Sequence, residues 1–584
     1  MSRDTLSANR LWADLIIEEM ARTGVDYFCV APGSRSTPLV AALASNPKAK
    51  NLVHFDERGT AFAALGYARA SGRPAAWITT SGTAVANGLP AVVEAATDAV
   101  PMILLTADRP PELRETGANQ TVVQPDIFGG YVRWSFDLPA PDPNLDAAMV
   151  LTTVDQAVYR ARRAPSGPVH LNLMFREPFL PDPDEDVGEE PPAPVRWRES
   201  GEPYTRYADT RPAVDPDEVE RLWEALGQVR RGLVVAGRLG RREQGEAALG
   251  LAESLGWPFL PDVGSQVRLG THSKNLVAYH DALLASEPFA EAHDPEAVLH
   301  VGGRAVSKRL ERFLGHSRPD PYVVVRENPF RLDPGHQVTH SVEADIVGFC
   351  EALAGVTGVG SSAYPAWTAG WREAADKVDL HLDRLLAGTE GLNEPLVARL
   401  ISRHIPEGHG LCVASSMPIR DVDTFAATDG AIVPVAANRG ASGIDGTVAT
   451  AAGFARGSGR PATLLIGDLA LLHDLNSLAM LRGLPAVVVV LNNDGGAIFS
   501  FLPVARHAEF FEPYFGTPQG VAFEGAAKMF GLAYELPHTT EEFVEAYGAA
   551  VAHGTPTLIE VRTDREENVA LHRRLLSGIS EATR

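Results

Sequence analysis

The hydrophobic pattern of the chain consists of short apolar runs that alternate with longer amphipathic stretches. The first stretch, at the N-terminus, predicts an amphipathic helix. In the first third, the following apolar runs predict strands: 26–30, 52–55, 75–79, 101–106 and 169–173. Most of the segments between them have helical periodicity, and many begin with a polar, glycine-containing turn. Short apolar strands that alternate with helices are typical of a doubly wound parallel sheet, so this part of the chain predicts an α/β domain.

The same alternation recurs twice. Further strands are predicted at 232–236, 257–260, 297–301 and 321–325, and then at 411–414, 431–435, 462–466, 486–491 and 557–562. A proline- and acid-rich stretch at 181–203 predicts an exposed tether, and a Gly/Ser-rich piece precedes a helix within 355–388. We therefore predict three doubly wound parallel-sheet α/β domains at 1–185, 210–354 and 389–584, with linkers at 186–209 and 355–388. The first and third domains share a layout of strand, polar turn and helix, which hints at duplication.

Composition narrows the possible functions. The chain has 584 residues, which is too long for one core, and its formal net charge of −22 argues against a general nucleic-acid-binding role. Its three cysteines are widely spaced, with neither a disulfide framework nor a zinc pattern, which suits a reducing cytoplasm. No apolar run approaches a membrane span, and the N-terminus does not resemble a signal peptide. A site for anionic ligands would therefore need a local concentration of Arg and Lys.

Residues 467–496 carry the strongest chemical signal. Gly467 and Asp468 follow one predicted strand, Asn493 and Gly495 follow the next, and 473–482 has helical periodicity between them. The carboxyl ends of neighbouring parallel strands are where such sheets bind ligands. A carboxylate, an amide carbonyl and a peptide carbonyl suit Mg²⁺ together with phosphate oxygens. We interpret the stretch as a Mg²⁺-diphosphate site; plain turn chemistry is the alternative.

Two further positions have both a structural and a functional interpretation. Glu57 ends a predicted strand and precedes a helix rich in small residues. It is either a helix cap and dipole partner or a buried acid that bonds a cofactor ring nitrogen. Ser34 and Arg35, in the turn PGSR, lie at a predicted helix N-terminus. They form either a capping turn or a carboxylate or phosphate site.

Cations gather near strand-end loops and helix starts of all three domains. They are Arg35, Arg109, Lys308, Arg309, Arg420 and Arg439, with Ser34, Asn119, Gln120 and Ser416 as neutral donors nearby. Each cation alone could be a solvated surface charge. In a chain of net charge −22, their placement is what a site for multiply anionic substrates requires. The sequence GRLG at 237–240 lacks the full dinucleotide fingerprint, so NAD or FAD binding is not expected there.

These motifs carry a resemblance to the thiamine diphosphate enzymes. Gly467-Asp468 followed by Asn492-Asn493 is similar to their diphosphate motif, and Glu57 resembles their activating glutamate. Within that superfamily, PGSRSTPL, TSGTAVAN, LTADRPPEL, GANQ, NRGASGIDG and NNDGGAIFS resemble the MenD family, the 2-succinyl-5-enolpyruvyl-6-hydroxy-3-cyclohexene-1-carboxylate synthases of menaquinone biosynthesis. The likeness spans nearly the whole chain. Leu469 departs from the third glycine of the general motif, and the interval from Asp468 to Asn493 is slightly short.

The resemblance implies a cytoplasmic transferase with pyrimidine-binding, central and diphosphate-binding domains, in chain order. Such an enzyme uses thiamine diphosphate and Mg²⁺, with Mn²⁺ as a possible substitute. It decarboxylates 2-oxoglutarate and adds the resulting succinyl carbanion to isochorismate in a 1,4-addition. The resemblance also implies a homodimer or homotetramer with active sites between subunits, and no nucleic-acid partner or membrane span.

Residue roles follow from the same resemblance. Asp468, Asn493 and Gly495 would bind the metal, Glu57 would exchange a proton with N1′ of the aminopyrimidine, and Ile444 would wedge between the cofactor rings. Other expected cofactor contacts are Ser416, Met417, Gly440, Ser442, Gly467, Leu469, Ile498 and Phe499. The expected substrate contacts are Ser34, Arg35, Arg109, Asn119, Gln120, Lys308, Arg309, Ser416, Arg420, Arg439 and Phe499, with Gln120 also catalytic.

Two other functions remain open at this point. Another thiamine enzyme, such as an acetolactate synthase or a 2-oxoacid decarboxylase, would share Glu57 and the metal motif but would not need so many cations. A regulatory protein on a degenerate thiamine fold would need neither. The intact Glu57, Asp468 and Asn493 argue against this second alternative.

Overall fold

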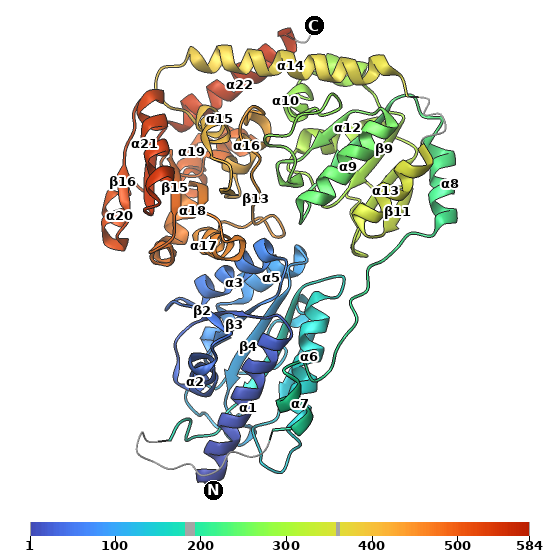
Figure 1. Ribbon diagram of the computed structural model, residues 1–584. Coiled ribbons are helices and arrows are strands. Elements are labelled where there is room, and N and C mark those ends of the chain that lie inside the picture. The colour runs from blue at the N-terminus through green and yellow to red at the C-terminus, as the bar shows by residue number, and fades with distance from the viewer. Residues whose placement is uncertain (1, 182–192, 358–362, 583–584) are drawn as a thin grey trace. The chain divides into compact units, whose positions relative to one another are not determined.

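The computed structural model describes residues 2–181, 193–357 and 363–582, and these residues form three all-parallel sheets (Figure 1). The strand orders are β2-β1-β3-β4-β6-β5, then β11-β10-β9-β7-β8, then β13-β12-β14-β15-β17-β16. The sheets, here called A, B and C, fall one each within the three predicted domain ranges. The prediction of three parallel-sheet α/β domains is confirmed, while the boundaries between them stay a prediction.

The chain divides into two compact units, which are described separately. Unit 1 comprises residues 1–210, 438–459 and 473–481, and it holds sheet A. Unit 2 comprises residues 211–437, 460–472 and 482–584, and it holds sheets B and C.

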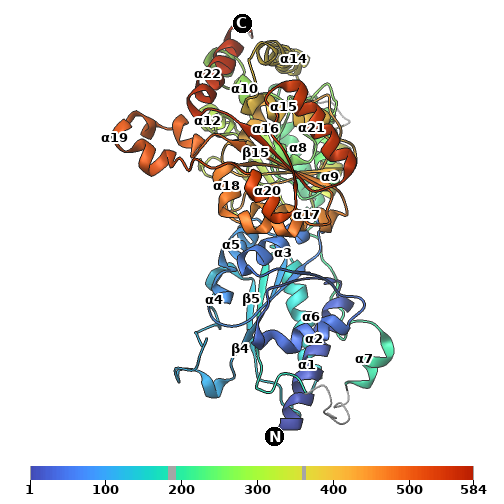
Figure 2. The same cartoon turned by 90° about the vertical axis from the view of Figure 1, so that its left-hand side faces the viewer.

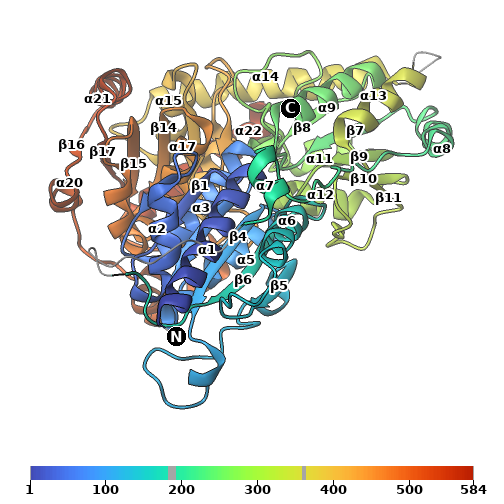
Figure 3. The ribbon, with the colours of Figure 1, turned by 60° about the horizontal axis from the view of Figure 1, so that its bottom comes forward.

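Sheet A is covered by helices on both faces. Its strands are β1 (Tyr27–Val30), β2 (Lys50–Val53), β3 (Ala75–Thr79), β4 (Met102–Asp108), β5 (Trp134–Leu138) and β6 (Pro168–Met174). The helices of unit 1 are α1 (Ser2–Arg22), α2 (Thr37–Ser45), α3 (Glu57–Ser71), α4 (Thr83–Ala86), α5 (Leu89–Thr97), α6 (Ala148–Arg162), α7 (Val195–Ser200) and α17 (Thr447–Ser458). Helices α1, α2 and α6 share one apolar core with the strands (Figure 3), whereas α3 and α5 pack together and contact strands of the same sheet.

Helix α17 packs closely along α3 within unit 1. Glycines on both helices make this approach possible. A Cβ at Gly66 would lie 2.1 Å from the carbonyl oxygen of Thr450, and a Cβ at Gly453 would lie 2.0 Å from that of Ala63. Any side chain at either position would push the two helices apart, which explains the small residues noted in this stretch of sequence.

Unit 2 contains the two other sheets. Sheet B consists of β7 (Gly232–Ala236), β8 (Phe259–Pro261), β9 (Ala297–Val301), β10 (Tyr322–Arg326) and β11 (His340–Glu343). Sheet C consists of β12 (Gly410–Val413), β13 (Val435–Ala436), β14 (Ala462–Gly467), β15 (Ala486–Asn492), β16 (Ala533–Glu535) and β17 (Thr557–Arg562). Their buried side chains form one continuous hydrophobic core.

Helices flank both sheets of unit 2. They are α8 (Pro216–Leu226), α9 (Arg242–Leu255), α10 (His280–Leu283), α11 (Glu287–Ala292), α12 (Lys308–Ser317), α13 (Ile346–Thr357), α14 (Pro365–Ala387), α15 (Glu394–His404), α16 (Met417–Phe425), α19 (Ala508–Phe511), α20 (Glu524–Phe530), α21 (Thr540–His553) and α22 (Arg565–Ala582). The long helix α14 contacts α10 and α22 (Figure 1), and the segment that carries α19 projects from the rest of unit 2 (Figure 2).

Sheets A and C have the same strand order when each is numbered from its own first strand. In both, the chain leaves the first strand for an edge strand on one side and then crosses to the third strand on the other side. The first and third strands therefore flank the topological switch point, where open α/β sheets bind ligands beyond the carboxyl ends of the strands. This shared order agrees with the duplication that the sequence hinted at.

The strand predictions were accurate in the centre of each sheet and wrong at the edges. Strands β5, β11 and β16 were not predicted, β2 and β8 are displaced by about two residues, and the strand expected at 431–435 is only Val435–Ala436. All six lie at a sheet edge. Edge strands have only one neighbour and can expose side chains, so they lack the continuous apolar run of a strand buried on both faces.

Two other parts of the prediction need correction. Helix α6 was not predicted. The helix expected at 473–482 is instead a short α-helix, α18 (Asp468–His473), followed by the 3₁₀ segment Leu475–Leu481. The buried carboxylate of Asp474 accepts bonds from Ala449 N at 3.0 Å and Ser477 Oγ at 2.7 Å, and these contacts favour a tighter local path over a continuous α-helix.

The predicted tether is in part folded against unit 1. Trp197 of α7 is 8% exposed, its indole N–H donates to Glu19 Oε2 at 2.5 Å, and the Arg22 guanidinium lies 4.0 Å from its ring centroid. Residues 182–192 of the predicted tether and residues 358–362 of the Gly/Ser-rich piece lie outside the described residues. All three cysteines are free and buried. Among the residues that the structure describes, no helix combines the length and apolar content needed to cross a membrane.

A buried histidine of sheet B is expected to make the stability of unit 2 sensitive to acid. Burial lowers the pKa of His300 from 6.5 to about 4, and its Nε2 lies 2.9 Å from the carbonyl oxygen of Gly303. As the pH falls below 6.5 the unfolded chain takes up the proton first, so folding stability should drop between pH 6.5 and 4, by roughly 3 kcal/mol in total. The His300→Gln variant can keep the bond but cannot titrate, so its Tm should depend less on pH over this range. An unchanged pH dependence would contradict this role.

Candidate active site

The metal edge of sheet C, which we define as Asp468, Asn493 and Gly495, lies where β14 and β15 end. Asp468 is 3% exposed, and its carboxylate accepts from Leu469 N at 2.8 Å and from Gly495 N at 2.7 Å. The bond to Gly495 fixes the end of one strand against the end of the next. Burial, together with the neighbouring charge of Asp494, raises the pKa of Asp468 to about 6. The hydrogen bonds from the backbone N–H groups of Leu469 and Gly495 oppose this shift. A carboxylate whose ionised form is destabilised by burial and by a like charge would be stabilised by a bound cation.

The second strand end supplies the remaining oxygens. Asn493 is 7% exposed, and its Oδ1 is buried without a hydrogen-bond partner among the described residues. Gly495 has φ 137°, and a Cβ there would lie 2.0 Å from the carbonyl oxygen of Gly516. Only glycine permits this turn, which brings the peptide back toward Asp468.

These residues fit the Mg²⁺-diphosphate group that the sequence predicted. The amide oxygen of Asn493 is buried without a hydrogen-bond partner among the described residues, so it is available to a bound cation, since an unpaired buried polar atom is costly. A carboxylate, an amide oxygen and a peptide oxygen are the hard ligands that Mg²⁺ prefers, with phosphate oxygens completing the shell. Within the described ranges, no group of three or more His, Cys, Asp or Glu side chains could hold a metal ion. The metal edge does not belong to that class of site, because two of its oxygens come from neutral groups.

Helix α16 begins at the switch point of sheet C, after β12. Ser416, its N-cap, has φ 73°, a strained conformation for a residue other than glycine. Arg420 Nη1 donates to the carbonyl oxygen of Ser416 within this first turn. Met417 is buried beside them. Strand β12 pairs with β14, so the start of α16 and Asp468 follow neighbouring strands.

The two cations at the start of α12 differ in their surroundings. Lys308 is exposed, whereas Arg309 Nη1 donates to Asp281 Oδ2 at 2.5 Å. Asp281 also accepts from Ser307 Oγ at 2.5 Å and from Thr424 Oγ1 of α16 at 2.8 Å. Burial alone would raise the pKa of Asp281, but Arg309 and the two hydroxyls outweigh it and hold the pKa below its ordinary value. By pairing with Asp281 of α10, Arg309 thus helps to fasten α10 to α16.

Replacing Arg309 should therefore affect stability as well as any substrate contact. Arg309→Ala leaves the buried Asp281 without its cation and should cost roughly 1.5–3 kcal/mol, measured as a lower Tm. Lys308→Ala is the matched control, since its side chain is exposed and its loss should leave Tm unchanged. If Arg309→Ala also left Tm unchanged, the fastening role would be wrong.

In unit 1, Glu57 is the first residue of α3. The helix is capped by Asp56, whose Oδ1 accepts from Arg58 N at 2.9 Å and Gly59 N at 3.3 Å. Glu57 is therefore not needed as the cap, and its half-buried carboxylate accepts from Asn87 Nδ2 at 3.3 Å. The capping role that the sequence offered for Glu57 belongs to its neighbour, whereas Glu57 still lies in the first turn of α3, where a carboxylate interacts favourably with the helix dipole.

Three predicted substrate contacts gather at the carboxyl edge of sheet A. Arg109 is 8% exposed, and it donates to Ser81 Oγ and to Gln120 Oε1, the latter at 3.4 Å. Arg35 Nη1 and Nη2 donate to the carbonyl oxygen of Phe175 and to Glu177 Oε1, both at 2.9 Å. Burial and the nearby charge of Arg109 lower the pKa of Arg35. The sequence did not predict that two of the Arg35 N–H groups form hydrogen bonds within the protein.

The other predicted donors near this edge are Ser34 and Asn119, and both are exposed. The structure describes no side-chain hydrogen bond that would orient either of them toward the arginines. Their expected contact with substrate stays a prediction.

The loop 438–446, also in unit 1, is held by a buried acid. Glu94 is 2% exposed, and its two oxygens accept from Gly440 N at 2.9 Å and Ala441 N at 2.7 Å. Ser442 has φ 62° and donates to the carbonyl oxygen of Arg439 at 3.4 Å. Ile444 is half-buried at the end of this shaped loop. The oddly placed apolar residue noted in the sequence is thus presented by a rigid backbone.

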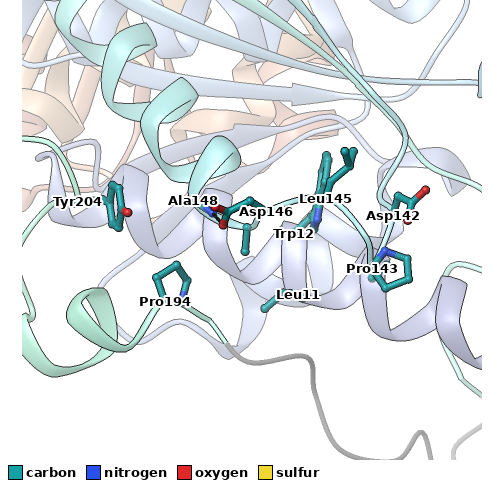
Figure 4. A pocket seen from close by; sticks show the side chains of 11 residues that line it. Leu11, Trp12, Asp142, Pro143, Leu145, Asp146, Ala148, Pro194 and Tyr204 are labelled. Atoms are coloured by element: carbon teal, nitrogen blue, oxygen red, sulfur yellow. Dashed lines mark hydrogen bonds between the residues drawn. The ribbon is translucent and has the colours of Figure 1, made fainter.

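Other expected cofactor contacts lie around the metal edge. Gly467, Leu469, Ile498 and Phe499 are all partly exposed, and Phe499 packs edge-on against Phe515 at 5.4 Å between ring centroids. A cavity of about 400 Å³ also lies in unit 1, between α1 and the segment 142–148 (Figure 4). Its lining includes Trp12, Leu145 and Tyr204 but none of the predicted site residues.

Several residues with a clear place in this geometry were not predicted. They are Ser81, Asn87, Glu94, Asp281 and Glu394, the last of which bonds Asn493. Each is a common polar residue in an ordinary helix or turn, and its importance comes from contacts with residues distant in the chain. The pattern Asn393-Glu394-Pro395 signals only a helix N-terminus, so sequence reasoning had no basis for singling out Glu394.

Comparison with known proteins agrees with this geometry. Three family models match the chain: the thiamine pyrophosphate enzyme N-terminal TPP binding domain at residues 11–127, the middle domain of thiamine pyrophosphate at 193–413, and the C-terminal TPP binding domain at 428–561. Together they account for most of the chain and follow the order of the three sheets.

Curated relatives align over almost the full length. The 2-succinyl-5-enolpyruvyl-6-hydroxy-3-cyclohexene-1-carboxylate synthase of Rubrobacter xylanophilus is 64% identical over 99% of this chain and 100% of its own. The synthases of the same name from Salinibacter ruber and Chlorobaculum tepidum are 50% and 46% identical, over 99% and 97% of this chain and 98% and 96% of theirs.

The three parallel sheets and the three family models that match the chain first define the class of protein. This protein is a thiamine-diphosphate-dependent enzyme. The level and extent of identity then place it more narrowly. The chain belongs to the family of 2-succinyl-5-enolpyruvyl-6-hydroxy-3-cyclohexene-1-carboxylate synthases, as the sequence motifs predicted.

Proposed function

We propose that this enzyme decarboxylates 2-oxoglutarate and adds the resulting four-carbon succinyl unit to isochorismate by 1,4-addition. The product is 2-succinyl-5-enolpyruvyl-6-hydroxy-3-cyclohexene-1-carboxylate, an intermediate of menaquinone biosynthesis. The structural observation that carries the proposal is the metal edge, where the buried Asp468 carboxylate and the orphaned Asn493 oxygen follow adjacent strands. The family relationship supports the identity of the substrates.

Each group of residues has its own task in this proposal. Asp468, Asn493 and the Gly495 peptide oxygen would hold Mg²⁺, or Mn²⁺ in its place, and thereby the cofactor diphosphate. Glu57 would hold or release a proton at N1′ of the aminopyrimidine ring, and Ile444 would support the bent cofactor. Thiamine diphosphate supplies the carbanion-stabilising carbon when bound. The protein contributes orientation and proton placement.

The cations have the task of binding four substrate carboxylates. Arg109, Gln120 and Arg35 lie at one edge of sheet A, and Arg420 lies at the switch point of sheet C. Arg–carboxylate pairs provide both charge and orientation. Lys308, Arg309, Arg439, Ser34, Asn119, Ser416 and Phe499 are proposed as further contacts to the substrates.

The test is turnover of 2-oxoglutarate with isochorismate, thiamine diphosphate and Mg²⁺, followed by identification of the product. Consumption of both substrates with release of carbon dioxide is expected. Pyruvate turnover without isochorismate consumption would instead identify an acetolactate synthase or a simple decarboxylase. No turnover together with no Mg²⁺-dependent cofactor binding would point to a regulatory protein on a degenerate fold.

We also propose a homodimer or homotetramer in which Glu57 and the metal edge of one site come from different subunits. Mixing the inactive variants Glu57→Gln and Asp468→Ala tests this arrangement. Random exchange puts about half the subunits in mixed dimers, each with one intact site, so about a quarter of wild-type activity should return. If both groups came from one subunit, mixing would restore none.

Two remaining assignments are also proposals. The sheets support domain ranges of 1–185, 210–354 and 389–584, with the pyrimidine-binding, central and diphosphate-binding roles in that order. The three free, buried cysteines support a cytoplasmic location.

A further inference from the structure

We propose that Glu394 is a positioning residue that fixes the orientation of the Asn493 side chain so that its oxygen faces the metal. This inference rests on the proposed metal site. Glu394 begins α15 and is 1% exposed. Its Oε1 accepts from Asn493 Nδ2 at 2.7 Å and from Thr563 Oγ1 at 3.2 Å.

The argument starts from the asymmetry of an amide. The Nδ2 atom of asparagine only donates hydrogen bonds, and Oδ1 only accepts them. Oε1 of Glu394 serves as an acceptor, so it selects the Nδ2 end of Asn493. Oδ1 must then point the other way, and it is this atom that is buried without a partner in the described part of the chain. Without Glu394 the amide could turn over, and its NH₂ group would face the cation.

The adjacent asparagine gives an internal comparison. Asn492 Nδ2 donates to Glu560 Oε1 at 2.9 Å, so two consecutive asparagines are each held by a buried glutamate. Glu560 also accepts from Phe523 N, Tyr534 Oη and Arg562 Nε, and these bonds outweigh burial and lower its pKa. Glu560 is thus a well-satisfied structural acid.

Glu394 is not satisfied in this way. Its Oε2 is buried without a hydrogen-bond partner among the described residues. A half-satisfied buried acid costs stability, and a nonpolar residue of similar size would avoid that cost. The contribution of Glu394 that a nonpolar residue could not replace is its hydrogen bond from Asn493 Nδ2.

Outer partners of metal ligands typically contribute 10- to 100-fold in metal affinity. We therefore expect Glu394→Met, which has similar size but no acceptor, to weaken Mg²⁺ binding by about 10- to 100-fold. Glu394→Gln can restore the acceptor and should recover most of the affinity. Binding is measured by calorimetry with Mg²⁺ at saturating thiamine diphosphate, and by the electron paramagnetic resonance spectrum of Mn²⁺. The Tm of the metal-free protein is followed in parallel.

Two comparisons separate this role from a general loss of structure. Glu560→Gln is the matched control, and it should lower Tm without changing Mg²⁺ affinity. Asn493→Ala should weaken Mg²⁺ binding by itself, and adding Glu394→Met to it should weaken binding no further, because Glu394 acts through Asn493. If Glu394→Met does not fold, Glu394→Asp replaces it, since the shorter chain withdraws the acceptor and about tenfold weaker binding is expected.

The outcomes are distinguishable. Normal Mg²⁺ affinity in Glu394→Met, with weak binding in Asn493→Ala, would overturn this inference and leave the metal site standing. Additive losses in the double variant would also overturn it, because they would show independent effects. Normal affinity in Asn493→Ala would overturn the proposed metal site and this inference with it.

Discussion

Glu57→Gln is expected to lower turnover by about 10²- to 10⁴-fold, the usual contribution of a positioned proton-transfer group. Glutamine has nearly the same size and can still accept from Asn87, so the local packing should survive. It cannot exchange a proton with the aminopyrimidine ring. The measurement is steady-state turnover with both substrates, alongside calorimetry of thiamine diphosphate binding and Tm.

The structure makes this a clean substitution. Asp56, not Glu57, caps α3, so the change should not remove a helix cap. Cofactor affinity is expected to change little, because most of the proposed binding contacts lie elsewhere. Turnover within tenfold of the wild type would show that the proton at N1′ is handled by another group.

Asp468→Ala is expected to abolish Mg²⁺-dependent binding of thiamine diphosphate, and activity with it. The substitution removes the only charged ligand of the metal edge and also the acceptor that holds Gly495 N at 2.7 Å. The loss should exceed the roughly 10- to 100-fold typical of outer partners. Calorimetry at fixed thiamine diphosphate with increasing Mg²⁺ measures it.

Asp494→Asn provides the matched control. Asp494 is exposed, and its Oδ1 accepts from Gln519 N at 2.8 Å and Gly520 N at 2.7 Å, bonds that an asparagine oxygen can also accept. It should bind Mg²⁺ and the cofactor almost normally. Equal losses in Asp468→Ala and Asp494→Asn would mean that acidity of the loop, and not the Asp468 carboxylate, is what matters.

The sequence predicted strands accurately where burial on both faces produces a continuous apolar run. Every central strand was predicted within about two residues, because strands covered on both faces form unbroken apolar runs. All six edge strands were missed or displaced, because their register depends on one neighbour and their side chains need not be apolar. The residues at the carboxyl ends of central strands, Asp468, Asn493 and Arg109, were therefore well placed by the same logic.

The supporting contacts of the site could not be predicted from sequence. Glu394 lies 99 positions from Asn493, and Glu94 lies 346 positions from Gly440. Pairs at such separations share no periodicity, and glutamate in a first helical turn usually indicates only a favourable dipole interaction. The ion pair of Arg309 with Asp281 was equally hidden from the sequence, in which the position of Arg309 suggested only a substrate contact, and that contact stays a prediction.

The shared strand order of sheets A and C places Arg109 and Asn493 at equivalent positions, each directly after the fourth strand of its sheet. The third strands end correspondingly near Ser81 and Asp468. In sheet C this pair of strand ends is rich in oxygen atoms, and in the proposed function a metal ion would bind there and attract a negatively charged ligand. In sheet A the guanidinium of Arg109, bonded to Ser81, supplies a positive charge as part of the chain. Two sheets of the same strand order would thus differ in electrostatic polarity: in our proposal the positive charge at sheet C comes from a bound metal ion, whereas at sheet A it comes from an arginine of the chain.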